Sequence, residues 1–258
     1  MGVLEDFLAI ATRWRTWFLM ANQDLALRYK RSVIGPFWIS IAMAVMILGI
    51  GVLFAQVQRI ETTSFLIFLG TGLLAWTLIS TCVNEGAGLI IEAEGHLRNV
   101  TLPIPLLAAK VVYRNLAIFG HNALVVGGLL LLLGAHPGPH LWQSGLALVV
   151  YVLLGVFVGV TLGPVCARFR DLPLLVSNLM QFAFFLTPIF WVPHSGLDRS
   201  VWLETNPFYH LIEIFRAPLL NEPVSELSWT VSLCILAGAA FAAMVSLSLT
   251  RRRVYLWL

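Results

Sequence analysis

The residues that could do chemistry in this chain are few, and they gather in two short polar stretches. The first set is Glu92, Glu94 and His96, and the second is Asp198, Glu204 and His210. Neither set has the spacing of a metal site or a catalytic cluster, and no HExxH or GxSxG motif occurs. A membrane enzyme acting on a lipid-linked substrate would have to use one of these sets, so this interpretation stays open as an alternative.

The sequence also lacks a nucleotide-binding motif. Its only lysines are Lys30 and Lys110, and neither follows a glycine-rich loop of the GxxxxGK[ST] type that cradles phosphates. The apolar stretches carry almost no ionisable groups, with His121 alone expected near the middle of one, whereas ion-coupled carriers place such groups at mid-membrane. We therefore expect no catalytic activity, cofactor or metal on this chain. If the chain transports a substrate, we expect another polypeptide to supply the energy.

Composition indicates a membrane protein. Hydrophobic residues make up 59% of the 258 positions and charged residues 11%, and the mean hydropathy is +0.87. Crossing the bilayer takes about 20 mostly apolar residues. Six stretches are long enough, and they lie at 36–55, 65–83, 106–133, 143–167, 172–192 and 229–250. We predict an all-α membrane protein with six transmembrane helices in residues 36–258, preceded by an interfacial segment in residues 1–35.

The distribution of lysine and arginine predicts the orientation. If the N-terminus lies in the cytoplasm, 13 of the 16 basic residues fall in cytoplasmic segments, and only Arg59, Arg199 and Arg216 fall outside. Cytoplasmic segments of membrane proteins are enriched in these residues. An odd number of spans would place one of the two basic ends of the chain outside. We therefore expect both termini in the cytoplasm.

Three segments outside the predicted spans have a character of their own. Residues 3–31 place apolar residues at helical spacing beside charges, which favours an amphipathic interfacial helix over a soluble one. Residues 84–105 carry charges of both signs, and suit either docking onto a soluble partner or an ordinary solvated turn. Residues 193–227, on the external side, are apolar but interrupted by proline, which favours short re-entrant or interfacial helices over a plain folded loop.

Two patterns inside the spans concern packing and lining. Small residues at 155, 159 and 163 on the fourth span form a ridge that allows another helix to approach closely. The fifth span is rich in aromatic residues, among them Phe182, Phe185, Phe190 and Trp191. Such rings either line a path for sugars or face lipid and the protein core.

Four stretches of the chain resemble the type 2 ABC exporter permeases for polysaccharides. Residues 24–38 (DLALRYKRSVIGPFW) resemble that family's pattern R-Y-[KR]-x-S-x-[LI]-G-x-x-W, where an interfacial helix turns into the first span. Residues 168–172 (RFRDL) resemble its cytoplasmic RD(L/I) turn, residues 187–191 (TPIFW) resemble the end of its fifth span, and residues 206–210 (NPFYH) resemble the start of an external gate helix. Their order and spacing agree across nearly the whole chain. The similarity is greatest to O-antigen export permeases, and capsule and teichoic-acid permeases are close relatives.

The resemblance implies a permease that forms a tunnel with a second copy of itself in the bacterial inner membrane. Two copies of a soluble ABC ATPase would lie beneath it and bind the ATP and Mg²⁺. The implied cargo is a polysaccharide linked to a polyprenyl pyrophosphate lipid, and no nucleic acid is involved. A permease of the same topology for drugs or small lipids is a further alternative.

The resemblance also assigns residues by position. Ile34 and Gly35 match the family's loop near the cytoplasmic tunnel mouth, which helps to receive the lipid head group. By charge complementarity we expect Arg28, Lys30 and Arg31 to bind its pyrophosphate, although simple positive-inside anchoring would explain the three cations equally well. The residues expected to couple the permease to the ATPase are Glu92, Glu94, His96, Arg98, Arg170 and Asp171. The external gate is expected in residues 193–227, and its candidate residues are Asn206, Pro207, Tyr209 and His210. The chain departs from the family at residues 96–103, which lack its basic and aromatic K-x-x-F-P stretch.

Overall fold

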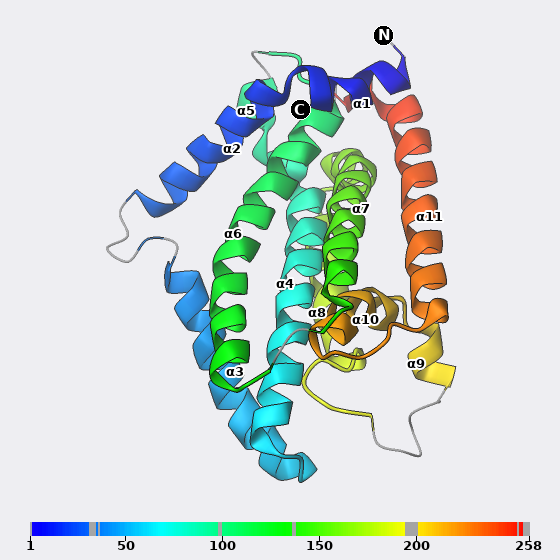
Figure 1. Ribbon diagram of the computed structural model, residues 1–258. Coiled ribbons are helices and arrows are strands. Elements are labelled where there is room, and N and C mark those ends of the chain that lie inside the picture. The colour runs from blue at the N-terminus through cyan, green and yellow to red at the C-terminus, as the bar shows by residue number, and fades with distance from the viewer. Residues whose placement is uncertain are drawn as a thin grey trace.

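The computed structural model describes residues 2–30, 35, 37–97, 100–135, 138–193, 201–251 and 253–254, and the elements within them are all α-helices (Figure 1). Five of these helices are long and apolar enough to cross a membrane: α3 (Phe37–Gln58), α4 (Thr62–Glu92), α6 (Ile104–Leu132), α7 (Leu141–Arg168) and α11 (Glu226–Thr250). A sixth apolar helix, α8 (Leu172–Leu186), is shorter. The predicted all-α fold with about six spans is confirmed.

Two of the predicted boundaries are wrong. The second span does not end at residue 83, because α4 continues through the polar residues Asn84 and Glu85 to Glu92. The fifth does not reach residue 192: the backbone turns to the extended region at Thr187, just before Pro188, and α8 ends at Leu186. The residue before a proline is disfavoured in the helical region, so a helix usually ends there.

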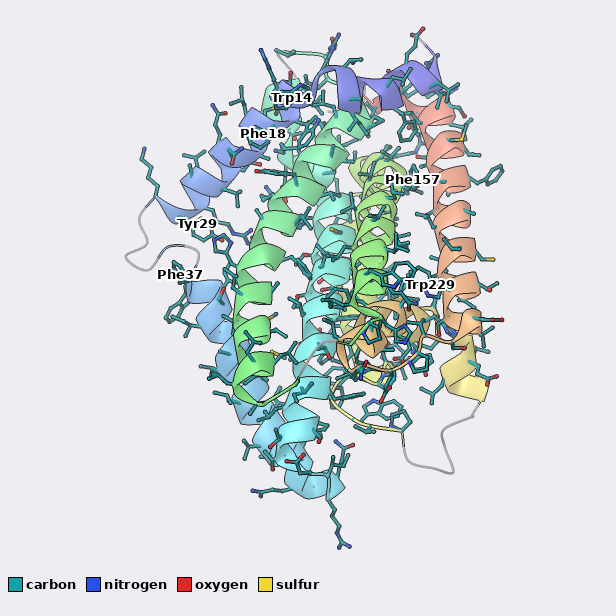
Figure 2. The ribbon with its side chains drawn as sticks, in the orientation of Figure 1. Trp14, Phe18, Tyr29, Phe37, Phe157 and Trp229 are labelled. Atoms are coloured by element: carbon teal, nitrogen blue, oxygen red, sulfur yellow. The ribbon has the colours of Figure 1, made fainter. Side chains whose placement is uncertain are left out.

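The helix α1 (Val3–Thr12) lies across one end of the bundle beside the last turns of α11, and α2 (Trp14–Tyr29) continues from it along α6 (Figure 1). We call this the terminal end. The single helix expected over residues 3–31 is broken at Arg13, and Trp17 Nε1 donates a hydrogen bond of 2.8 Å back to the Ile10 carbonyl. Figure 2 shows Trp14 and Phe18 along α2, and the Phe18 ring packs 5.1 Å from that of Tyr113 on α6. Aromatic contacts of this kind hold α2 against α6.

The opposite end of the bundle, the distal end, carries the turn between α3 and α4. Glu61 caps α4 there by accepting hydrogen bonds from the side chain and the backbone N–H of Ser64. The Ser64 hydroxyl, with further hydrogen bonds, lowers the pKa of this exposed carboxyl to about 2. The same end holds two short helices, α9 (Val201–Thr205) and α10 (Pro207–Leu219), and α10 packs against α4, α7 and α11. Short helices were expected in this segment from its prolines.

The core of the bundle is the contact between α4 and α7. A Cβ placed on Gly86 of α4 would lie 3.0 Å from the Cα of Gly159 on α7, so the two backbones are nearly touching. Gly155 and Gly163 lie one turn to either side, against Cys82 and Leu89 of α4. The small-residue ridge on the fourth span is therefore the surface on which α4 packs.

Replacing Gly86 with leucine is expected to destabilise the bundle by about 1–3 kcal/mol, the usual range for overpacking. The obstacle is backbone rather than a flexible side chain, so the helices must move apart. A lower melting temperature in detergent would show this. The matched control is Gly120→Leu on α6, where a Cβ meets nothing within 4 Å. Equal melting temperatures for the two variants would contradict the close contact.

Candidate functional site

A cluster of ionised side chains joins α2, α4 and α6 near the terminal end. Lys110 Nζ and Arg114 Nη1 on α6 lie 2.8 and 3.0 Å from the same carboxylate oxygen of Asp24 on α2. Arg114 Nη2 lies 2.8 Å from Glu85 and 3.6 Å from Glu92, both on α4. We call these five residues the ion-pair cluster. It cross-links three helices through two cations and three carboxylates.

Burial makes this cluster more consequential than a surface salt bridge. Arg114 is 8% exposed and Lys110 is 7% exposed, whereas Glu92 at the edge of the cluster is exposed. Buried ions are tolerated only when their partners are well placed, and Arg114 satisfies this with two carboxylates within 3.0 Å. The arrangement fixes how α2 and α6 sit relative to α4.

The residues expected to receive the lipid head group lie along the end of α2 and beyond it. Arg28 and Lys30 are exposed, and Arg28 Nη1 lies 3.7 Å from Glu85, so it borders the ion-pair cluster. Gly35 has φ +60, a backbone conformation that suits glycine. Arg31 and Ile34 lie outside the described residues. The role of these residues stays a prediction.

The residues expected to contact an ATPase are spread over the terminal end. Glu94 begins a one-turn helix, α5 (Glu94–Leu97), directly after α4, and Glu92 belongs to the ion-pair cluster. Arg170 and Asp171 are exposed in the turn between α7 and α8. The side chain of His96 and the whole of Arg98 lie outside the described residues. Glu92 lies 3.6 Å from Arg114, and the role of these residues as ATPase contacts stays a prediction.

The aromatic residues of the fifth predicted span surround a pocket at the distal end. Its volume is about 650 Å³, and its described lining combines α8 with α10 through residues that include Phe182, Phe185, Trp191, Asn206 and Phe208. None of the described residues that line it is charged. The Phe190 ring lies 5.8 Å from that of Phe185 and 5.6 Å from that of Phe54 on α3. The predicted lining residues thus gather around one cavity and beside it.

The N-terminus of α10 is attached to the broken end of α8. The Asn206 side chain accepts hydrogen bonds from the backbone N–H groups of Phe208 and Tyr209, and its amide donates to the Leu186 carbonyl at 3.3 Å. Pro207 occupies the first turn of α10, where a missing N–H is harmless. Asn206 therefore links the two helices and caps one of them.

His210 is buried and ties α10 to its neighbours. Its Nε2 donates to the Glu204 backbone carbonyl at 2.9 Å, and its Nδ1 lies 3.0 Å from the Ser228 hydroxyl on α11. The Tyr209 ring lies 5.2 Å away. The histidine thus reaches Glu204 through the main chain rather than the carboxylate, and Asp198 lies outside the described residues. The second polar set identified in the sequence does not form a catalytic pair in the described part of the chain.

Sequence reasoning missed two sets of buried charges. Asp24, Glu85 and Arg114 were not recognised as one cluster, although Lys110 and Arg114 stand four residues apart and Glu85 and Glu92 seven apart, which places each pair on one helix face. The other is Arg216 on α10, which is 3% exposed and donates to Glu213 and to the Pro188 carbonyl. Charges inside apolar helices were the available signal.

A bundle of long apolar helices with α1 and α2 at one end defines a multi-pass membrane protein. The chain belongs to the family described as ABC-2 type transporter, which it matches over residues 15–220. Its relatives include the O-antigen export system permease protein RfbA of Myxococcus xanthus, 26% identical over 239 residues that make up 92% of each chain. Another is the protein of the same name from Klebsiella pneumoniae, 26% identical over 248 residues that cover 93% of this chain and 92% of the relative.

Membership of this family makes the chain the membrane subunit of an ATP-driven transporter. Nucleotide binding and hydrolysis take place on a separate ATPase subunit, so the prediction that this chain is not itself an enzyme is confirmed. The ATPase is accordingly a partner of this protein.

Proposed function

We propose that this protein is the permease of an exporter that moves a polysaccharide on a polyprenyl pyrophosphate lipid across the bacterial inner membrane. The observation that carries the proposal is its similarity to O-antigen export permeases over 92% of both chains. The fold alone would admit other cargo, because folds do not specify function. The aromatic pocket, whose described lining carries no charge, supports a sugar polymer, since rings stack on the apolar faces of sugars.

In this proposal the terminal end of the bundle faces the cytoplasm. Arg28, Lys30, Lys110 and Arg114 all lie at or near that end, which agrees with the enrichment of basic residues on the cytoplasmic side of membranes. The distal end, with α10 and the aromatic pocket, then faces the periplasm. An accessibility assay on single cysteines at positions 28 and 222 would test this orientation.

Two copies are proposed to form the tunnel between them, along the exposed faces of α3 and α8. Trp38 on α3 and Phe182 on α8 are each 62% exposed, and similar large apolar residues are exposed along both helices. A continuous apolar face of this kind is covered by lipid or by another protein. In a dimer these two helices would surround the path of the polymer, with an ATPase under each copy.

The ion-pair cluster suggests how movement of the ATPase reaches the spans. The short helix α5 follows α4 directly at the terminal end, and the exposed turn at residues 169–171 lies between α7 and α8. Because Arg114 ties α4 to α2 and α6, a displacement of α5 moves three helices together rather than one. Glu94, His96, Arg98, Arg170 and Asp171 are the proposed contacts.

The decisive experiment is co-purification with the ATPase. The permease and a soluble Walker-motif ATPase from the same cells should purify as one complex, and deletion of the permease should trap lipid-linked glycan on the cytoplasmic face of the membrane. A permease that purifies alone and modifies a lipid-linked substrate would contradict export. Normal glycan export in the deletion strain would contradict it equally.

Replacing Arg28 and Lys30 together with glutamine is expected to reduce surface polymer about tenfold or more. A charge-assisted hydrogen bond to an anionic head group contributes about 1.5–3 kcal/mol, and tenfold corresponds to about 1.4 kcal/mol. Both side chains are exposed, so the protein should still reach the membrane in normal amounts. The matched control is Arg13→Gln with Arg15→Gln, a pair of exposed arginines at the same interface. Equal amounts of surface polymer in the two double variants would indicate that Arg28 and Lys30 only anchor the protein at the membrane surface.

A further inference from the structure

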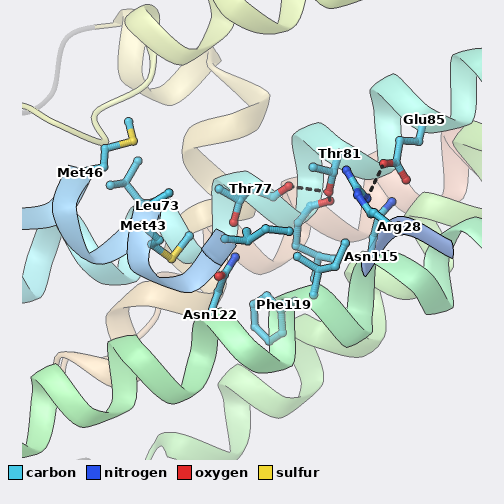
Figure 3. A pocket seen from close by; sticks show the side chains of 14 residues that line it. Arg28, Met43, Met46, Leu73, Thr77, Thr81, Glu85, Asn115, Phe119 and Asn122 are labelled. Carbon is cyan, nitrogen blue, oxygen red and sulfur yellow. Dashed lines mark hydrogen bonds and ion pairs between the residues drawn. The ribbon is translucent and has the colours of Figure 1, made fainter. Parts of the chain in front are cut away.

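A cavity separate from the aromatic pocket lies within the protomer, between α3 on one side and α4 and α6 on the other (Figure 3). Its volume is about 280 Å³, near the lower end for pockets that hold small molecules, about 300 Å³. Most of its wall is apolar and includes Ile39, Met43 and Met46 from α3, Leu73 from α4 and Phe119 from α6. An apolar cavity inside a membrane-spanning bundle is matched in chemistry by a hydrocarbon chain.

One end of this cavity is bordered by charge. Arg28 of α2 lines it together with Glu85, and Figure 3 shows both beside Asn115. Glu85 is already neutralised by Arg114, whose Nη2 lies 2.8 Å away, whereas Arg28 lies 3.7 Å from it and keeps 47% of its side chain exposed. Arg28 is therefore available to a second anion at the mouth of the cavity.

Asn115 supplies a second, independent observation. This residue lines the cavity and is 2% exposed, and its side-chain oxygen has no hydrogen-bond partner within the described residues. Its amide nitrogen has only a contact of 4.0 Å with the Cys82 sulfur. A buried amide that stays unpaired is costly, so a ligand with a hydrogen-bond donor is favoured at this depth.

We propose that this cavity holds one acyl chain of an anionic glycerophospholipid from the leaflet at the terminal end. The phosphate binds Arg28, a head-group hydroxyl faces Asn115, and the chain lies between Met43 and Phe119. The volume takes part of one chain, and the rest of the lipid lies outside the cavity at its mouth, beside Arg28. Such a lipid is a resident of each protomer and is distinct from the transported molecule. Because the proposed function also assigns Arg28 to the transported head group, the test is made without glycan and uses a prenyl phosphate as competitor.

The test is lipid retention by the purified permease, measured by native mass spectrometry without ATPase or glycan. Delipidated protein is offered phosphatidylglycerol or phosphatidylcholine, which differ in net charge and in head-group hydroxyls. We expect one phosphatidylglycerol per chain, bound at least tenfold more tightly than phosphatidylcholine. Equal retention of the two lipids would overturn the proposal, and so would displacement of phosphatidylglycerol by an equimolar prenyl phosphate, which would assign the cavity to the transported lipid.

Two variants separate the chain from the head group. Ala42→Phe places a ring in the cavity and should abolish retention of the lipid, whereas Val45→Phe, on the exposed side of α3 and not in the cavity wall, should leave it unchanged. Arg28→Gln should weaken binding of phosphatidylglycerol about tenfold and weaken phosphatidylcholine less, because the choline cation already neutralises the phosphate that the two lipids share. Arg28→Gln changes no core packing, so it decides the question even if Ala42→Phe fails to fold. Full retention in Arg28→Gln would refute the proposed head-group contact.

Discussion

Replacing Arg114 with glutamine is expected to lower the free energy of unfolding by about 3–5 kcal/mol, the range for breaking a buried ion pair by removing one partner. The guanidinium is 8% exposed and holds Asp24 at 3.0 Å and Glu85 at 2.8 Å. Glutamine leaves Glu85 with Arg28 alone of its two arginine partners, at the longer distance of 3.7 Å. The expected result is a clear fall in melting temperature and in the amount of protein recovered from membranes.

A second substitution tests whether the uncompensated charge is the cause. Adding Glu85→Gln to Arg114→Gln removes the unpaired carboxylate, so the double variant should be more stable than Arg114→Gln alone, which is the signature of coupled neighbours. Arg15→Gln, an exposed arginine on α2, serves as the control and should melt like the unmodified protein. If the effects of the two substitutions on the free energy of unfolding simply add, Arg114 acts through packing rather than through its charge.

Hydropathy was sufficient to predict the bundle, whereas the orientation inferred from arginine and lysine stays a prediction. Long apolar stretches can satisfy their backbone groups in a membrane only as helices, so α3, α6, α7 and α11 begin and end close to their predicted positions. Where polar residues interrupt a stretch, this reasoning fails. Glu85 suggested the end of a span, but its pairing with Arg114 allows α4 to continue to Glu92.

Contacts between helices were the part that the sequence could not show. The partners of Arg114 come from residues 90 and 29 positions away in the chain, and a single sequence does not record which helix faces which. The glycine ridge is an exception, because a run of small residues at every fourth position marks a contact face without naming the partner. The candidate site was likewise predicted as separate segments, and only the fold shows that Arg28 borders both the ion-pair cluster and the apolar cavity.

Arg216 shows the same limitation at the distal end, where it was counted only as an external basic residue. Its Nη1 donates to the Pro188 carbonyl at 2.8 Å, its Nη2 donates to Glu213 at 2.7 Å, and its guanidinium lies 4.0 Å from the centre of the Phe68 ring. The acceptor on Pro188 is free because α8 has ended at Leu186. The Arg216 side chain thus supplies a hydrogen-bond donor to the carbonyl left free beyond the end of α8, and it holds α10 against α4 and α8.

Replacing Arg216 with methionine is therefore expected to destabilise the protein by about 3–5 kcal/mol, since it leaves the half-buried carboxylate of Glu213 and the buried carbonyl of Pro188 without their partner. Hydrogen exchange should rise first in α10, which loses its contact with Pro188, before the long helices exchange. The stability of Arg216→Lys should lie between that of the unmodified protein and that of Arg216→Met, because an ammonium group cannot reproduce the planar two-sided contact of the guanidinium. The control is Arg59→Met, an exposed arginine at the same end of the bundle. If α10 keeps its protection in Arg216→Met, then Asn206 and His210 alone hold the helix in place, and the arginine is not what couples α10 to α8.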